Sequence, residues 1–257
     1  MASPSQTLAK ALQHHQTGQY TEAEQLYRQV LALEPQNIAA WHLLGRLADQ
    51  LGHPSSAVQC LQQAITIRPD YAEAHSDLGT ILEAQGKLPE AAVCYRRALE
   101  LNPGDASTHF NLGNVQRQQG DRGGATASFR TALTVNPELS PAHFNLGRML
   151  TEDGRLDEAV AHFQRALTTA PHDPAILIGL GFALQQQGKT LEAIDQYRSA
   201  LLIAPNNVDA LYNLATIFEQ QEKHDDALVS YRRVLVLNPD HVVPIQIWAY
   251  SCGTRAT

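Results

Sequence analysis

The chain has 257 residues, with 19 lysines and arginines against 26 aspartates and glutamates, which gives a formal net charge of −7. This acidic balance and the lack of any basic run argue against nucleic acid as the main partner. The N-terminus has no apolar signal-peptide core and no stretch reaches about 18 apolar residues, so we expect neither secretion nor a membrane span. Three cysteines are too few for a disulfide framework, and a reducing cytoplasm is the expected compartment.

A proline recurs along the chain at a constant spacing of 34 residues. A strict period between about 20 and 50 residues indicates one supersecondary unit stacked on copies of itself. Each copy has too little apolar surface to fold alone, so the stack is the folded object. The prolines are Pro35, Pro69, Pro103, Pro137, Pro171, Pro205 and Pro239. With the proline at position 32, the units are 4–37, 38–71, 72–105, 106–139, 140–173, 174–207 and 208–241.

Position 15 of these units predicts a turn between two helices. It is glycine in six units and Glu222 in the seventh, and glycine can take the left-handed conformation that ends a helix and reverses the chain. Apolar residues at helical spacing flank it, as at 142–151 and 156–168. Proline at position 32 cannot continue the second helix, because it lacks an N–H. We therefore expect a helix A, a tight turn, a helix B and a break in every unit.

Three further positions predict how helix A packs on helix B. Position 20 is alanine in all seven units, position 8 is glycine in five, and position 24 is an aromatic ring in six. The small residues allow a close approach, and we expect the ring to fill the remaining space. In the first unit, Thr7, Lys10 and His14 stand where helix A should be apolar, which suits an N-terminal cap with a polar outer face.

This pattern resembles the tetratricopeptide repeat (TPR), in which glycine in helix A is followed by A-x3-[FY]-x2-A and a proline. The segment AHFNLGRMLTEDGRLDEAVAHFQRALTTAP, residues 142–171, matches the family motif nearly throughout. One departure is position 4, often tryptophan in the family and here only at Trp41. The resemblance covers residues 4–241 and implies an all-α, right-handed superhelical solenoid of seven helix-turn-helix units.

Position 4 carries His75, His109 and His143 in three successive units, which raises the question of a metal site. Equivalent residues of stacked repeats lie roughly 10 Å apart, whereas zinc ligands lie about 2 Å from one ion. We therefore interpret these histidines as packing residues and expect neither a metal nor another cofactor. Cys60 and Cys94 share position 23, and we interpret them as small half-buried residues rather than a redox pair.

A second face of helix A, formed by positions 2, 5, 6, 9, 12 and 13, lies opposite the packed arc. In the TPR family this face lines the concave side of the superhelix, so the resemblance implies a groove that binds a peptide. The candidate groove residues here are amides, apolar or aromatic side chains, and arginines. They are Asn111, Asn114, Asn145, Asn213, Phe110, Phe144, Ile178, Phe182, Tyr212, Arg46, Arg117 and Arg148.

The asparagines at position 6 are in register, and an amide can pair with the backbone of an extended peptide whatever its sequence. The row Asn111, Asn145 and Asn213 resembles the asparagine ladder in the TPR superhelix of O-GlcNAc transferase, although Gly179 interrupts it. For the apolar row at position 5, packing against the neighbouring helix A remains an equal alternative. Another TPR class clamps a C-terminal carboxylate with lysines at positions 2 and 5, and their absence here disfavours that mode.

Two further segments are an acidic pair, Glu152–Asp153, and an apolar C-terminal stretch, residues 242–257. Glu152–Asp153 lies at a predicted helix end and is interpreted as solvated charge. Residues 242–257 are expected to form a capping helix or the start of an eighth repeat, with Trp248 covering the seventh unit. Ile247 and Tyr250 then have nothing to bury against, which indicates self-association through this end or a longer parent chain.

The sequence thus predicts a scaffold that holds an extended segment of a protein or peptide partner in its concave groove. No G-x-S-x-G, H-E-x-x-H or G-x4-G-K-[ST] motif occurs, so we expect no enzymatic activity. Two alternatives remain open: the substrate-recruiting segment of a larger transferase, and a structural scaffold that assembles end to end.

Overall fold

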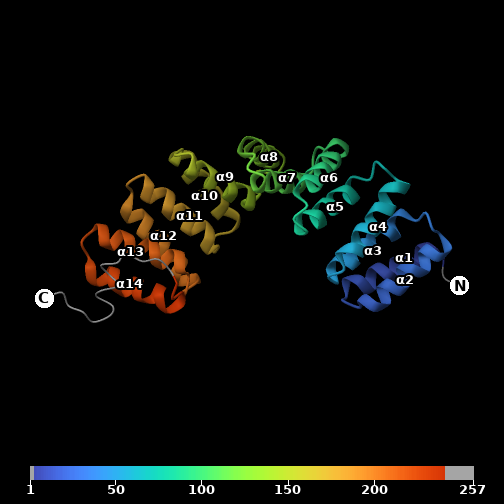
Figure 1. Cartoon of the computed structure of the whole chain (residues 1–257), viewed down its shortest axis with the longest axis horizontal. Coiled ribbons are helices and arrows are strands. Elements are labelled where there is room, and N and C mark those ends of the chain that lie inside the picture. Colours follow the sequence, from blue (N-terminus) through green and yellow to red (C-terminus); the bar gives the residue numbers. More distant parts are fainter. Residues whose placement is uncertain (1–2, 241–257) are drawn as a thin grey trace. The chain divides into compact units, whose positions relative to one another are not determined.

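The computed structural model describes residues 3–240, and within this range every regular element is an α-helix (Figure 1). The predicted all-α helical repeat fold is therefore confirmed. The expected capping helix at 242–257 lies outside the described residues. By internal contacts the chain divides into two compact units, Met1–Val135 and Asn136–Thr257, each of which is a stack of helix pairs.

In the first unit, each pair packs as a hairpin, and its second helix also contacts the first helix of the next pair. The first helices of neighbouring pairs touch as well, so three helices meet at every junction within the unit. The eight helices are α1 (Pro4–Gln16), α2 (Tyr20–Leu33), α3 (Ile38–Gln50), α4 (Pro54–Ile67), α5 (Ala72–Ala84), α6 (Leu88–Leu101), α7 (Ala106–Gln118) and α8 (Arg122–Val135).

The second unit repeats the same arrangement with three pairs, in which α11 contacts both α9 and α13. The helix α11 therefore lies between α9 and α13, the first helices of the two neighbouring pairs. The described helices are α9 (Ser140–Glu152), α10 (Leu156–Thr169), α11 (Pro174–Gln186), α12 (Thr190–Ile203), α13 (Val208–Gln220) and α14 (His224–Leu237).

The turn inside each pair depends on a left-handed residue at position 15, as predicted. The six glycines there have φ between 73° and 81°. At Gly52, the N–H bonds to the carbonyl of Asp49 and the N–H of His53 bonds to that of Ala48, which satisfies two carbonyls at the end of α3. Glu222 takes the same conformation in the last pair with φ of 58°, although it has a Cβ.

Position 4 ties each helix A to the proline that precedes it. The indole N–H of Trp41 donates to the carbonyl oxygen of Pro35 at 2.8 Å. The Nε2 atoms of His75, His109 and His143 make the equivalent bond at 2.9–3.0 Å, to the carbonyls of the prolines six residues earlier. A proline carbonyl oxygen can only accept, so each ring nitrogen donates. These histidines therefore hold the break between repeats in place.

The core of each pair is a buried ring against small residues. A Cβ built on Gly79 would lie 2.7 Å from Cε1 of Tyr95, which explains why position 8 is small. Four of the rings are tyrosines, and each hydroxyl bonds at 3.0–3.2 Å to a polar side chain at position 12 of its own repeat. The pairs are Tyr27 with His15, Tyr95 with Glu83, Tyr197 with Gln185, and Tyr231 with Glu219.

The first helix differs in one respect from the polar cap that the sequence predicts. Lys10 is exposed, but Thr7 is buried with 6% of its surface accessible. The Thr7 hydroxyl donates to the carbonyl oxygen of Ser3 at 3.0 Å, which satisfies its polar group without water. A threonine can therefore replace an apolar residue at this position.

Candidate functional site

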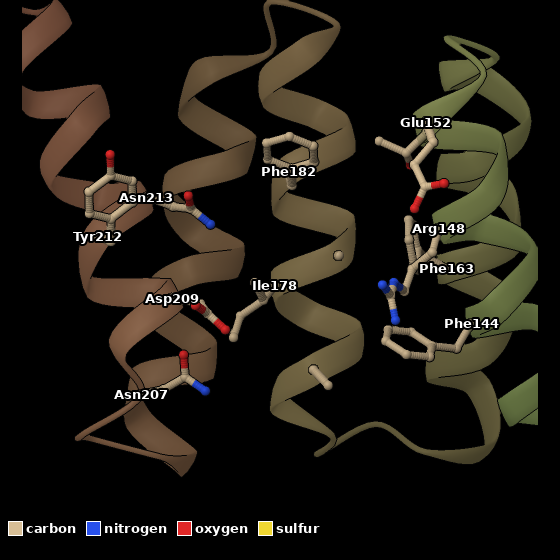
Figure 2. Close-up of a pocket in the computed structure, with 13 residues that line it drawn as sticks. Phe144, Arg148, Glu152, Phe163, Ile178, Phe182, Asn207, Asp209, Tyr212 and Asn213 are labelled. Carbon is tan, nitrogen blue, oxygen red and sulfur yellow. The ribbon is translucent and has the colours of Figure 1, made fainter. Parts of the chain in front are cut away.

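The first helices of the three pairs in the second unit, α9, α11 and α13, line a groove of about 590 Å³ (Figure 2). This volume falls in the range of about 300–1,000 Å³ that is typical of ligand sites. Phe144, Arg148, Ile178, Phe182, Tyr212 and Asn213 all line it. The structure thus brings together six of the side chains that the sequence places on the concave face.

The middle of the groove is apolar. Phe144 comes from α9, and Ile178 and Phe182 project from α11. Phe182 keeps 41% of its surface exposed, so much of its ring is available for apolar contact in the groove. Phe144 packs on the buried ring of Phe163 with centroids 6.0 Å apart, so one face of it belongs to the core. Both interpretations of the position-5 row therefore apply to Phe144.

Gly179 gives the groove its depth. A Cβ at this position would lie 2.7 Å from Cε1 of Phe163, closer than real contacts allow. Because α11 has no side chain here, the ring edge of Phe163 reaches the wall of the groove although the residue is only 1% exposed. The gap in the row of asparagines is thus a requirement of packing.

Charged side chains stand on both outer walls. Arg148 and Glu152 belong to α9, and Asp209 belongs to α13 (Figure 2). The guanidinium carbon of Arg148 lies 5.8 Å from the ring centroid of Phe144, within the range of a cation–π contact. Glu152 is exposed at the end of α9, as the interpretation of solvated charge predicts, and it also lines the groove.

Amides complete the groove at the α13 side. Asn213 is half-buried and lines the groove, whereas Asn145 is half-buried on α9 but is not among the lining residues. Asn207 lines it too, and its side-chain oxygen accepts the backbone N–H of Ala210 at 2.9 Å as the N-cap of α13. Of the two ladder asparagines in this unit, Asn213 lines the groove and Asn145 does not.

The remaining predicted residues belong to the first unit and do not line this groove. Phe110 packs on Phe129 with ring centroids 5.7 Å apart, and Asn111 and Asn114 are half-buried on α7. Arg117 is exposed near the end of the same helix. Their assignment to a binding surface stays a prediction.

Arg46 lines a separate polar pocket of about 220 Å³ in the first unit, together with Asp77 and Thr80. Behind it lies the buried side chain of His42, with Nε2 2.8 Å from the Asp77 carboxylate and Nδ1 2.8 Å from the Tyr71 hydroxyl. A carboxylate oxygen can only accept, so Nε2 donates to Asp77. Burial, more than the nearby Glu73 carboxylate, raises the pKa of Tyr71. The network joins α3 to α5.

Several groove residues escaped the sequence interpretation. Thr151, Ala175 and Asp209 occupy positions 12 and 2 of the concave arc, so the periodicity contained a signal for them. Phe163 gave none, because position 24 is a core position in every repeat. No group of three or more potential metal ligands occurs among residues 3–240, and no helix in that range is both long and apolar enough to cross a membrane.

The structure resembles several solved repeat proteins. YrrB, described as "a TPR protein with an unusual peptide-binding site", is 23% identical with a TM-score of 0.64, over 77% of this chain and all of that one. PilF of Pseudomonas aeruginosa is 21% identical with a TM-score of 0.70, over 84% and 97%. MamA is 25% identical with a TM-score of 0.58, over 63% and 94%. A search of curated proteins finds no match.

Family models agree with the repeat pattern. Models described as "Tetratricopeptide repeat" match residues 14–76, 110–174 and 208–241, and one described as "TPR repeat" matches 79–120 and 186–222. Together these matches extend over most of the helix pairs in both units. The chain therefore belongs to the tetratricopeptide repeat family.

Proposed function

We propose that this protein is a non-catalytic scaffold that holds an extended segment of a protein partner in the groove of its second unit. The observation that carries the proposal is the groove between α9, α11 and α13, where exposed Phe182 lies beside Ile178 and the Asn213 amide. Aromatic side chains supply apolar contact area, and an amide can pair with a peptide backbone. The similarity to YrrB adds support.

A site-specific crosslink tests where the partner binds. Phe182 on α11 is replaced by the photoreactive residue p-benzoylphenylalanine, and illumination of the full chain in cell extract is followed by mass spectrometry. The matched control carries the same residue at Leu202 on α12, an apolar position of the same repeat that is 85% exposed but lies outside the groove. We expect one defined segment of a partner to be crosslinked at 182 and not at 202.

Crosslinking from position 202 alone, or from neither position, would contradict the proposal. A defined segment from position 182 also identifies the peptide for the measurements that follow.

The role proposed for Asn213 has its own test. Replacing Asn213 by alanine should weaken binding of the crosslinked segment by about 1–3 kcal/mol, because this amide lines the groove. Calorimetric titration measures the affinity, and circular dichroism checks the fold. Gln164→Ala, an exposed amide on α10, is the control and should leave the affinity unchanged. Equal affinities for the Asn213→Ala variant and the parent would remove Asn213 from the binding surface.

A further inference from the structure

The groove has one place where a ligand side chain can meet the bare protein backbone. Along the groove-facing side of α11 small and large residues alternate, in the order Ala175, Ile178, Gly179 and Phe182. At Gly179 the wall consists of the helix backbone and the ring edge of Phe163. The surroundings of this gap are therefore apolar and well packed.

No side chain of α11 can project from this part of the wall, because the Phe163 ring already occupies the place of a Cβ at 179, with Cε1 2.7 Å from it. A partner side chain that packs against this wall would bury the apolar groups of Ile178 and Phe182, which are half-buried and exposed in the free protein. Such central apolar pockets are where interfaces place their strongest contacts. The geometry favours a large aromatic or aliphatic side chain of the partner at this place.

The charges of the groove favour a lysine or arginine in the partner, close to the inserted apolar side chain. Glu152 on α9 and Asp209 on α13 give the two outer walls a carboxylate each, against the single guanidinium of Arg148. Arg148 is directed over the Phe144 ring, so its charge is partly offset by the ring face. An excess of one negative charge in a concave surface attracts cations and repels acidic segments.

Resting on the function proposed above, we propose that the groove of the second unit is specific for an extended basic peptide that inserts one large apolar side chain against Gly179. A lysine or arginine of the same peptide then pairs with Asp209. The half-buried amide of Asn213 pairs with the peptide backbone beside the inserted side chain.

Synthetic peptides test this specificity without knowledge of the natural partner. Four fluorescein-labelled peptides of about nine residues, roughly 30 Å when extended, share a Gly/Ser/Thr host. Their variable residues are Phe with Arg, Ala with Arg, Phe with Glu, and Ala with Glu. Fluorescence anisotropy with the full chain should show the tightest binding for Phe with Arg, and a loss of about tenfold for each replacement.

Variants of the protein test the preference for a basic residue and the preference for a large apolar side chain separately. The double variant Glu152→Lys, Asp209→Lys should reverse the preference, so that the Phe/Glu peptide binds more tightly than the Phe/Arg peptide. The control Glu192→Lys, Asp195→Lys on α12 makes the same change in net charge at exposed positions outside the groove and should keep the original preference. Phe182→Ser should reduce the advantage of Phe over Ala without moving the Phe163 ring.

The outcomes separate this inference from the proposed function. Peptides that bind with equal affinity whether they carry Phe or Ala, or Arg or Glu, overturn the inference but leave the groove as a binding surface. A charge-reversed variant that keeps the original preference does the same. If none of the four peptides binds at about 1 mM, the proposed function fails together with the inference.

Discussion

At the residue scale, each buried tyrosine at position 24 makes the stability of the fold depend on alkaline pH. Burial is the main cause of the raised pKa in each case, and it takes the pKa of Tyr27 to about 12. The pKa values of Tyr95, Tyr197 and Tyr231 are raised in the same direction. A raised pKa means that the folded state keeps the proton longer than the unfolded state does. Each ring therefore contributes its full stability below about pH 10 and loses it as the pH rises toward the folded pKa.

We expect the midpoint of thermal unfolding to be constant from about pH 8 to 9.5 and to fall steadily from about pH 10 to 12. The Tyr197→Phe variant removes one ionisable phenol and should show a smaller alkaline loss. At pH 8 it should be less stable than the parent, because Gln185 loses its hydroxyl donor. Circular dichroism across the pH series measures both effects. An identical alkaline slope in parent and variant would mean that Tyr197 ionises at the same pH whether folded or not.

At the scale of the element, the turn of the last helix pair is strained. Glu222 has φ of 58°, whereas the other six pairs place glycine at this position. A Cβ in the left-handed region costs roughly 1–2 kcal/mol. The positive φ of Glu222 therefore makes the α13–α14 hairpin less stable than a hairpin with glycine at this position.

Glu222→Gly should raise the free energy of unfolding by about 1 kcal/mol, since part of the relieved strain is offset by the greater freedom of glycine in the unfolded chain. Urea denaturation followed by circular dichroism gives the value. The reverse exchange Gly188→Glu, in the α11–α12 turn where φ is 78°, should lower stability by a similar amount. Opposite signs for the two exchanges are essential to this interpretation, and a destabilised Glu222→Gly variant would refute it.

Helix pairs and their turns could be predicted from the sequence because each is decided within one 34-residue unit. Glycine at position 15 and proline at position 32 act locally, and so does the ring at position 24. The groove depends on contacts between neighbouring repeats, such as that of Phe163 on α10 with Gly179 on α11. The 34-residue period assigns Phe163 to the core and Gly179 to the concave face, but it does not show that the two residues meet. From the sequence, Gly179 could therefore be interpreted only as an interruption of the row of asparagines.

At the scale of the whole molecule, the chain divides into two stacks, and within residues 3–240 the main contacts of each helix pair are with the neighbouring pairs. In such a stack, stability is the sum of the stabilities of the repeats and of their interfaces. An interior repeat of the first unit, such as the α5–α6 pair, takes part in two interfaces, whereas the α1–α2 pair takes part in one. Damage to the two pairs should therefore differ in its effect.

Ala91→Leu on α6 and Ala23→Leu on α2 test this difference, because both alanines are fully buried at position 20. Each substitution overpacks its pair at a cost of about 1–3 kcal/mol. We expect Ala91→Leu to lower the midpoint of urea denaturation more than Ala23→Leu, whose damage should remain at the end of the stack. Equal losses would show that unfolding of the first unit is all-or-none rather than governed by neighbouring interfaces.

The hydroxyl bonds of the buried tyrosines have a consequence for how such a chain can grow. Donor and acceptor lie twelve residues apart inside one repeat, as in Tyr231 with Glu219 and Tyr197 with Gln185. A duplication that copies 34 residues in any register that keeps both helices together also copies the complete pair. The new repeat then arrives with its buried phenol already satisfied, so lengthening the array demands compensating changes only at the surfaces where old and new repeats meet.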